Sequence, residues 1–459
     1  MSERGDSSYY YAHPLSLVYI GHSALCHQVH PSVGNTINAV KYTIPNPSSS
    51  LKQARNIASA MEPTPRTHST TLAEQENIPA SMPALYLPLP PSHPYTTTNP
   101  PWPSTLLYTA THPTPTPTSS QYLVKIQTTA LCRGELGWAE TLSPASHASS
   151  RPTTTTTTQP QPDNPVLLKR IPGHDISGIV LSTPQIDERS MAGPKFKVGD
   201  EVIGLLAFAR DGGAADVAVA LEGELAFKPR NVSALHAACL PLSALTAWQA
   251  VFEQAGVKGV RRVLVLNASG GVGGMVCQLL KADMLFGDGE GNGSGRFWVC
   301  GVCSGRNEEF VRDQLRVDEV LDYTKEREGL GAAFRKRGWA PVDFVLDCVG
   351  GQTLKQAYDA AVVRDGGIVV SIAQPVPEKE PEWADVRDAV VKRGLTSRFF
   401  IVRPDGEQLG KIALLVEGGE LKSFVEREME LYQGREAMEL VESGRVRGKV
   451  VLRVNNYDR

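Results

Sequence analysis

A turn rich in small residues carries the strongest chemical signal in the sequence. It reads Ala268-Ser-Gly-Gly-Val-Gly-Gly274, follows the apolar segment 263–267 and precedes the helical pattern of residues 272–285. Small residues allow a tight turn and a close approach of the backbone to a pyrophosphate, and the first amides of the helix attract its charge. The sequence therefore predicts a dinucleotide site here; the alternative is a turn that only packs a helix on a sheet.

The end of the next expected strand, residues 297–303, bears on which dinucleotide binds. A site that prefers NAD carries a carboxylate here for the ribose hydroxyl, whereas this strand is followed by Ser304 and then Arg306. A guanidinium offers paired donors to a phosphate, so the pattern favours NADPH. A solvated arginine is the alternative interpretation. Tyr323, after the third strand, either reaches the same phosphate or caps the sheet edge.

The elements that position these residues alternate between strands and helices from Ala234 onward. Helices are expected at residues 242–255, 272–285 and 308–315, and strands at 261–267, 297–303, 319–322, 344–348, 368–372 and 398–402. This alternation, with apolar and β-branched strands, indicates a parallel sheet wrapped by helices. Upstream, residues 82–89, 122–128 and 197–205 have the pattern of a β-rich region.

Three segments interrupt this pattern. Residues 1–81 lack hydrophobic periodicity and are rich in Ser, Thr, Pro and Asn, so we expect a mostly disordered N-terminal extension. Glu3 and Asp6 argue against a transit peptide, and the short apolar run at 15–20 lacks the basic flank of a signal peptide. Residues 143–164, with their run of threonines, and the glycine-rich residues 287–295 are expected to be surface insertions.

Composition excludes several classes of protein. The chain has 459 residues, 41% of them hydrophobic, with 46 basic against 49 acidic residues and a net charge of -3. This balance offers no electrostatic footprint for nucleic acid or an anionic membrane, and we expect no apolar stretch long enough to span a bilayer. The seven scattered cysteines indicate reduced thiols. We therefore expect a cytoplasmic enzyme with a small-molecule substrate and no nucleic-acid or membrane partner, and we leave a homodimer open.

Motifs along the chain occur in the order of one known family. They are Gly173-His-Asp-Ile-Ser-Gly178, Lys197-Val-Gly-Asp-Glu-Val202, Leu245-Thr-Ala-Trp248, the glycine turn, Asp318-Glu-Val-Leu-Asp-Tyr323, Asp343-Phe-Val-Leu-Asp-Cys-Val-Gly350 and Ser443-Gly-Arg-Val-Arg-Gly-Lys449. Together they resemble the medium-chain dehydrogenase/reductase superfamily, in its zinc-independent quinone oxidoreductase-like branch, over about residues 82–454. The resemblance implies an α/β fold: a Rossmann nucleotide-binding domain at 232–402, and a GroES-like β-rich substrate domain at 82–231 completed by residues 403–459.

The resemblance also implies that the active site lies in the cleft between the two domains. The substrate-pocket candidates are Cys132, Glu135, Trp138 and His174, with a surface turn as the alternative for Glu135 and Trp138. Lys449, after a turn glycine, either faces the cleft or is solvated. The cofactor-binding candidates are Thr246, Ser269, Gly270, Gly271, Val272, Gly273, Ser304, Arg306, Tyr323, Cys348, Val349, Gly350, Ile372 and Phe400. The alternatives are helix packing for Thr246 and ordinary core for Phe400.

No metal is expected. In the zinc-dependent branch a Cys, a His and a third residue bind the metal; here Cys132 and His174 match the first two positions and Leu242 stands at the third. Asp175 replaces the usual Glu after the His. A catalytic zinc site needs three protein ligands and an open position. The structural alternatives are a small buried thiol for Cys132 and a hydrogen-bonded histidine for His174.

The implied function is hydride transfer from NADPH to a quinone or an α,β-unsaturated carbonyl acceptor. The cofactor supplies the chemistry, and the protein aligns the acceptor and stabilises the developing oxyanion. A pathway-specific enoyl reductase and a non-catalytic NADPH-binding protein are the alternatives. A zinc alcohol dehydrogenase is a weaker alternative, because without zinc no strong Lewis acid polarises a simple ketone.

Overall fold

The computed structural model describes residues 78–88, 95, 100–138, 169–185, 193–286 and 297–455. The expectations for residues 1–77, for the insertion at 143–164 and for the glycine-rich segment 287–295 lie outside the described residues. Within the expected extension, Ser81 already begins the first strand, β1 (Ser81–Pro88).

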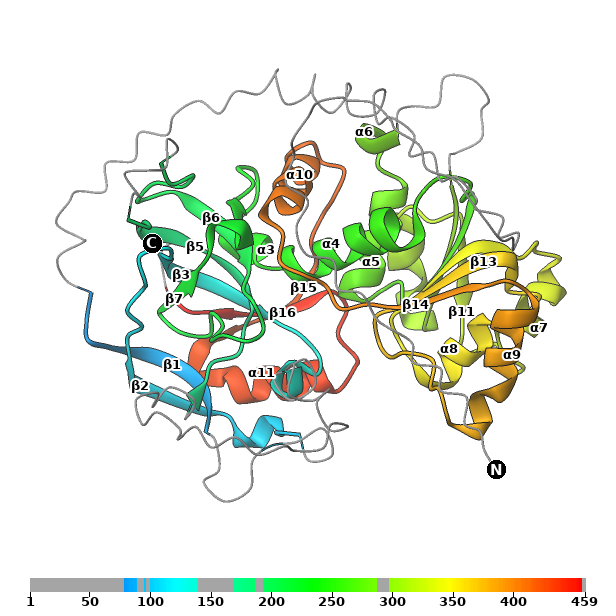
Figure 1. Ribbon diagram of the computed structural model, residues 1–459, viewed down its shortest axis with the longest axis horizontal. Helices are drawn as coiled ribbons and strands as arrows, with labels where there is room; N and C mark the ends of the chain where they lie inside the picture. The colour runs from blue at the N-terminus through cyan, green and yellow to red at the C-terminus, as the bar shows by residue number, and fades with distance from the viewer. Residues whose placement is uncertain are drawn as a thin grey trace, which may run out of the picture. The chain divides into compact units, whose positions relative to one another are not determined.

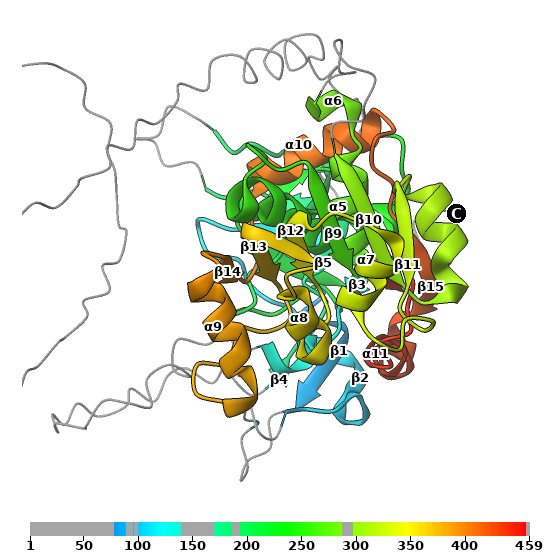
Figure 2. The same cartoon turned by 90° about the vertical axis from the view of Figure 1, so that its right-hand side faces the viewer.

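A six-stranded parallel sheet forms one half of the described structure (Figure 1). Its strands are β9 (Arg262–Leu266), β10 (Trp298–Cys303), β11 (Glu319–Asp322), β12 (Val342–Asp347), β13 (Val363–Ser371) and β14 (Thr396–Phe399). They lie in the order β11-β10-β9-β12-β13-β14 (Figure 2). The order reverses between β9 and β12, which is where ligands bind in open α/β sheets. This confirms the expected Rossmann domain.

Helices cover both faces of this sheet. They are α4 (Pro241–Trp248), α5 (Gly271–Leu280), α7 (Leu330–Arg337), α8 (Gly351–Ala357), α9 (Ala384–Lys392) and α10 (Gly406–Glu417). Side chains of β9 alternate between the faces: Val263 and Val265 pack in the core that includes α4, α5 and α10. Leu264 and Leu266 pack in the core that includes α7, α8 and α9. This double burial explains the continuous apolar sequence of the strand.

A seven-stranded, mostly antiparallel sheet forms the β-rich half. Its strands are β3 (Tyr122–Leu131), β5 (Asp175–Ser182), β6 (Glu201–Leu205), β7 (Val217–Ala220), β8 (Leu225–Phe227), β15 (Val425–Glu430) and β16 (Lys449–Arg453). The last strand, β16, pairs antiparallel with β3, so the end of the chain returns to the β-rich half. Beside it, β1 pairs with β2 (Leu107–Pro113) and β4 (Lys169–Arg170), and α11 (Gly434–Glu442) packs on β16. The β-rich GroES-like domain is thus confirmed, whereas its exact boundaries stay a prediction.

The helix expected at residues 242–255 is α4 continued by a π-helix, η6 (Gln249–Ala255). With α3 (Ala234–Ala237) this region forms a helical run, Ala234–Ala255, that by length and composition alone could cross a membrane. The expectation that no stretch would qualify is therefore wrong. However, 72% of its most apolar window is buried within the protein, between the two sheets (Figure 1).

The last strand of the parallel sheet is shorter than expected. A strand at 398–402 was predicted, but β14 ends at Phe399. Residues 400–402 leave the sheet and line the cavity described next. Their apolar side chains explain why the pattern alone could not distinguish a strand from a cavity wall.

Candidate functional site

A cavity of about 670 Å³ lies at the carboxyl ends of the parallel strands, where the strand order reverses. Its other wall comes from the β-rich half, including the end of β3 and residues 441–450. Lys449 and eleven of the expected site residues line it; the eleven are Cys132, Trp138, Thr246, Gly270, Gly271, Val272, Gly273, Cys348, Val349, Ile372 and Phe400, of which Cys132 and Trp138 were substrate-pocket candidates. The expected residues outside its lining are Glu135, His174, Ser269, Ser304, Arg306, Tyr323 and Gly350.

The glycine turn brings backbone very close to backbone. A Cβ on Gly273 would lie 2.2 Å from the carbonyl oxygen of Asn267, and one on Gly270 would lie 2.7 Å from the side-chain Nδ2 of Asn267. Helix α5 starts at Gly271 with no side-chain cap, and its first residues line the cavity. An uncapped helix N-terminus carries partial positive charge and suits an anionic group. The turn therefore fits the pyrophosphate of a dinucleotide.

A segment from the β-rich half crosses this turn. The amide of Gly448 donates to the carbonyl of Ser269 at 3.3 Å, and the Arg306 guanidinium donates to the carbonyl of Arg445 at 2.8 Å. The side-chain amide of Asn307 donates to the Ser269 hydroxyl at 3.1 Å, and this hydrogen bond connects the turn to the segment that follows β10. The nucleotide turn is thus held from both halves, a contact that the local sequence pattern did not indicate.

The expected ribose end carries charges of both signs. Arg306 and Tyr323 are exposed, and Lys325 forms ion pairs with Asp322 at 3.1 Å and with Glu308 at 3.6 Å. A Cβ on Gly305 would lie 2.5 Å from an Asp322 oxygen, so this carboxylate sits against the turn after β10. A guanidinium has five N–H donors, so Arg306 retains donors for a phosphate beyond its bond to Arg445.

A buried carboxylate shapes the loop after β12. Asp347 accepts from the amides of Val349 and Gly350 at 3.0 Å and from the Ser371 hydroxyl at 2.6 Å. This network holds Cys348 and Val349 against the cavity and leaves Gly350 behind its wall. Burial raises the pKa of the Cys348 thiol well above its usual range, so it is neutral. The missed signal for Asp347 is a lone acid at the end of an apolar strand.

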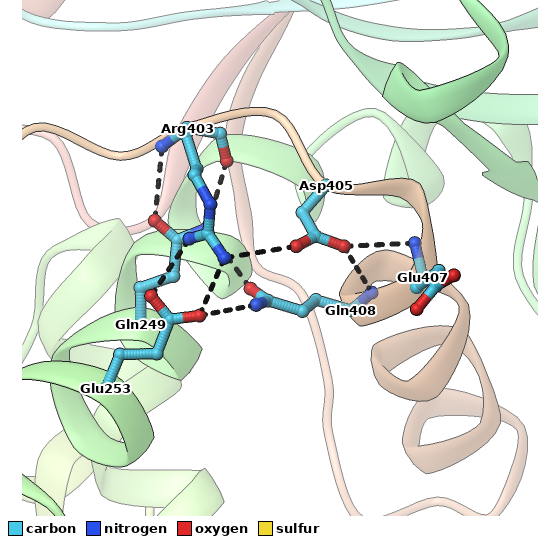
Figure 3. Close-up of polar contacts among 6 residues, drawn as sticks. All are labelled: Gln249, Glu253, Arg403, Asp405, Glu407 and Gln408. Atoms are coloured by element: carbon cyan, nitrogen blue, oxygen red, sulfur yellow. Dashed lines mark hydrogen bonds and ion pairs between the residues drawn. The ribbon is translucent and has the colours of Figure 1, made fainter. Parts of the chain in front are cut away.

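Figure 3 shows how the wall segment after β14 is anchored. The side-chain amide of Gln249, in the π-helix, donates to the carbonyl of Arg403 at 2.9 Å and accepts from its amide at 3.1 Å. The Arg403 guanidinium bonds both Glu253 oxygens at 2.9 Å. Asp405 caps α10 through the amides of Glu407 and Gln408. The carboxyl end of the segment is therefore attached to the π-helix η6 and to α10, while the amide of Phe400 at its other end donates to the carbonyl of Ser371 in β13 at 3.3 Å.

Replacing Arg403 by Ala should have a small effect. Its pair with Glu253 is largely exposed, whereas Gln249 is buried and still holds the backbone of residue 403. We expect Arg403→Ala to lower the free energy of unfolding by about 0.5–1 kcal/mol, measured by urea denaturation, with unchanged NADPH affinity. A loss above about 2 kcal/mol would mean that the ion pair, not the Gln249 amide, anchors the segment.

Glu135 points away from the cavity, contrary to its expected place in the substrate pocket. Its carboxylate accepts from the amides of Cys132 at 2.9 Å, Gly173 at 2.5 Å and His174 at 3.1 Å. Burial raises the pKa of Glu135 to about 7, although the backbone donors favour its ionised form. Glu135 therefore joins the loop after β3 to the start of β5, and the direction of its side chain depends on that distant loop.

His174 also lies outside the cavity lining. Its ring packs edge-on against Phe208, with centroids 5.3 Å apart, and near Trp138, and both aromatic residues do line the cavity. Burial lowers the pKa of His174 to about 4, so the ring is neutral at pH 7. Its Nδ1 is buried without a hydrogen-bond partner among the described residues. His174 therefore supports the aromatic wall from behind.

A buried lysine stands beside the position where a zinc ligand would be. Lys449 Nζ lies 2.7 Å from Cys132 Sγ and 2.7 Å from Asp175 Oδ2. Asp175 Oδ1 accepts from the amide of Leu242 at 2.5 Å. The described residues contain no group of three His, Cys, Asp or Glu side chains arranged to hold a metal. Leu242 supplies no third ligand, and the positive charge of Lys449 beside the Cys132 sulfur repels a metal cation, so this donor set does not fit a catalytic zinc ion.

Comparisons with known proteins connect these features to oxidoreductases. The family described as "Zinc-binding dehydrogenase" matches residues 315–452. A protein of Arthroderma benhamiae named "Probable zinc-binding oxidoreductase, mitochondrial" is 36% identical over 363 residues, covering 77% of this chain and 94% of the relative. A mitochondrial NAD(P)H oxidoreductase of Bos taurus is 31% identical over 303 residues, covering 61% and 70%. The solved quinone oxidoreductase of Coxiella burnetii is 25% identical with a TM-score of 0.61, covering 82% of this chain and 100% of that one.

The expected cytoplasmic location is wrong. The fungal and bovine relatives are both named mitochondrial, which points to an organelle. The expectation relied on Glu3 and Asp6 near the N-terminus and on the unpaired cysteines, and neither feature distinguishes the cytoplasm from another reducing compartment.

Proposed function

This chain belongs to the medium-chain dehydrogenase/reductase superfamily, in its quinone oxidoreductase-like branch, and we propose that it reduces a quinone or an α,β-unsaturated carbonyl compound with NADPH and without zinc. Its general role is that of an NAD(P)H-dependent oxidoreductase. The observation that carries the proposal is the cavity itself, which joins an uncapped glycine turn to a wall containing a buried ammonium. An anion-binding turn and a cation on the neighbouring wall from the β-rich half suit reduction of a carbonyl compound.

The residues proposed to hold the cofactor follow the ends of successive strands. Gly270 to Gly273 would take the pyrophosphate, Ser304, Arg306 and Tyr323 the phosphorylated ribose, and Thr246, Cys348, Val349, Ile372 and Phe400 the nicotinamide. Ser269 and Gly350 shape the turns beside them. When bound, the nicotinamide supplies a hydride. The chain's part is to orient both reactants and to exclude water.

The acceptor site is proposed to be the part of the cavity between Trp138, Phe208 and Ile401. These three side chains are apolar, and the flat rings of Trp138 and Phe208 suit a planar conjugated acceptor. Hydride addition to its β-carbon leaves negative charge on the carbonyl oxygen, and hydrogen-bond donors must stabilise that charge. Water can then protonate the α-carbon, so no acid–base pair of side chains is required.

Mixing the full chain with NADPH and a panel of quinones, enals and enoyl thioesters tests this function. We expect NADPH oxidation with quinones or enals, with the saturated carbonyl or hydroquinone as product. Turnover with one enoyl thioester alone would favour a pathway-specific enoyl reductase. Tight NADPH binding without any turnover would favour a non-catalytic NADPH-binding protein.

Chelation should leave the activity unchanged. Leu242 supplies no ligand and Lys449 contacts the Cys132 sulfur, so we expect well under one zinc per chain and a rate within about twofold of the untreated protein after dialysis against 1,10-phenanthroline. Elemental analysis and the NADPH oxidation rate provide the measurements. One zinc per chain that disappears in Cys132→Ser would overturn this prediction.

A further inference from the structure

Lys449 is an almost fully buried cation that nevertheless lines the cavity. It is the first residue of β16, follows Gly448 at a positive φ, and is 6% exposed. An ammonium has three N–H donors, and the described residues offer its Nζ two acceptors, Cys132 Sγ and Asp175 Oδ2. One donor therefore remains for a ligand in the cavity.

The surroundings of Lys449 keep it charged. Asp175 is fully buried and carries no other cation within ion-pair distance in the described structure. Burial alone would lower the pKa of Lys449, but the Asp175 carboxylate outweighs it and holds that pKa above its usual range. Burial raises the pKa of the Cys132 thiol, so Cys132 is neutral and its Sγ donates to Asp175 at 3.6 Å. The cluster is thus one ion pair and one thiol.

The geometry fixes the ammonium at one point of the cavity wall. Asp175 is itself held by the amide of Leu242, and both Leu242 and Cys132 line the cavity beside Lys449. A flexible surface lysine would lose rotamer entropy on meeting a ligand, whereas this one is already ordered. A preorganised charge in a site with little water is the arrangement that stabilises an oxyanion most strongly.

We propose that the Lys449 ammonium is the oxyanion-stabilising group of this enzyme, donating a hydrogen bond to the carbonyl oxygen of the acceptor, with Asp175 as its positioning residue. The proposal rests on the proposed function. The hydride, which NADPH would supply on being oxidised to NADP⁺, forms the new C–H bond at the β-carbon, and the C=C electron pair moves so that charge gathers on the oxygen. A proton from water then forms the α C–H bond, and the hydroxide left behind takes up a proton from the solvent, so the acceptor gains one hydride and one proton in total.

The test removes both charges together. Lys449→Met alone would leave Asp175 buried and unpaired, which destabilises a protein strongly. The variant is therefore Lys449→Met combined with Asp175→Asn, which keeps an acceptor for the Leu242 amide. Lys392→Met with Asp388→Asn, an exposed pair 2.8 Å apart on α9, is the matched control. We expect the buried double variant to lose about 10²- to 10³-fold in kcat, with its unfolding midpoint and NADPH affinity close to those of the control.

A second readout does not depend on turnover. 4-Nitrophenol added to the protein with NADP⁺ reports its ionisation by its absorbance, and its phenolate resembles the enolate oxygen. We expect the wild type and the control to bind it as the phenolate at a pH where free 4-nitrophenol is protonated, and the buried double variant to bind it neutral. Unchanged kcat and an unchanged phenolate signal in that variant would overturn the role of Lys449. A phenolate signal without reduction of any carbonyl acceptor would instead reject the proposed function.

Discussion

Gly273→Ala should lower the affinity for NADPH about hundredfold, because a Cβ at this position has no room. The atoms it would meet are backbone: the Asn267 oxygen at 2.2 Å and the Ala268 Cα at 2.9 Å. Backbone cannot rotate away as a side chain can, so the start of α5 must move away from β9. That movement displaces the amides that would face the pyrophosphate. Quenching of protein fluorescence by NADPH measures the affinity.

The neighbouring glycine provides the control for that experiment. A Cβ on Gly274 would lie 3.5 Å from the Ala268 oxygen and 3.7 Å from Leu315, which are ordinary contacts. Alanine is favoured over glycine inside a helix by about 1 kcal/mol, so Gly274→Ala should bind NADPH like the wild type and unfold at an equal or higher temperature. Equal NADPH affinities for the two variants would show that the turn only packs α5 on the sheet.

Local pattern was enough for the parallel sheet and the glycine turn. The strand segment at 263–266 was predictable because each of its residues meets a core on one face or the other, so this run is apolar. The turn at 268–274 was predictable because its constraint acts between residues six apart or fewer, such as Asn267 and Gly273. In both cases the residues of the segment itself carry the signal, as a continuous apolar run or as closely spaced glycines.

The other wall of the cavity could not be derived in this way. Lys449 meets Cys132 and Asp175 across 317 and 274 residues of chain, so no local spacing records the cluster. Glu135 follows the early strand as a pocket residue would, but its carboxylate accepts hydrogen bonds from the amides of Gly173 and His174 and so points away from the cavity. The hydrogen bond from Arg306 to the Arg445 carbonyl joins residues 139 apart, so the local sequence pattern could not predict it either. Such contacts depend on how β5 and β16 are placed beside β3, which is a property of the topology.

Arg306→Ala should weaken NADPH binding about tenfold to a hundredfold and leave NADH binding nearly unchanged. Arg306 follows the end of β10, is exposed, and keeps donors beyond its bond to the Arg445 carbonyl, so it can form a charge-assisted contact with a 2′-phosphate. Ser304→Asp should shift the preference further from NADPH toward NADH. A carboxylate at this position repels the 2′-phosphate of NADPH and accepts a hydrogen bond from the free 2′-hydroxyl of NADH. Titrating both cofactors against the wild type and the two variants measures the selectivity.

Arg312→Ala is the matched control, because Arg312 is an exposed arginine nearby that already pairs with Glu308 at 2.8 Å. It should change neither affinity. The hydrogen bond from Arg306 to the Arg445 carbonyl explains what a loss of affinity for both cofactors would mean. If Arg306→Ala weakened NADH and NADPH equally, the guanidinium would act by holding the segment 445–448 over the glycine turn, and Asp322 against Gly305 would be the residue to test for ribose recognition. Equal affinities of the wild type for the two cofactors would reject the NADPH preference outright.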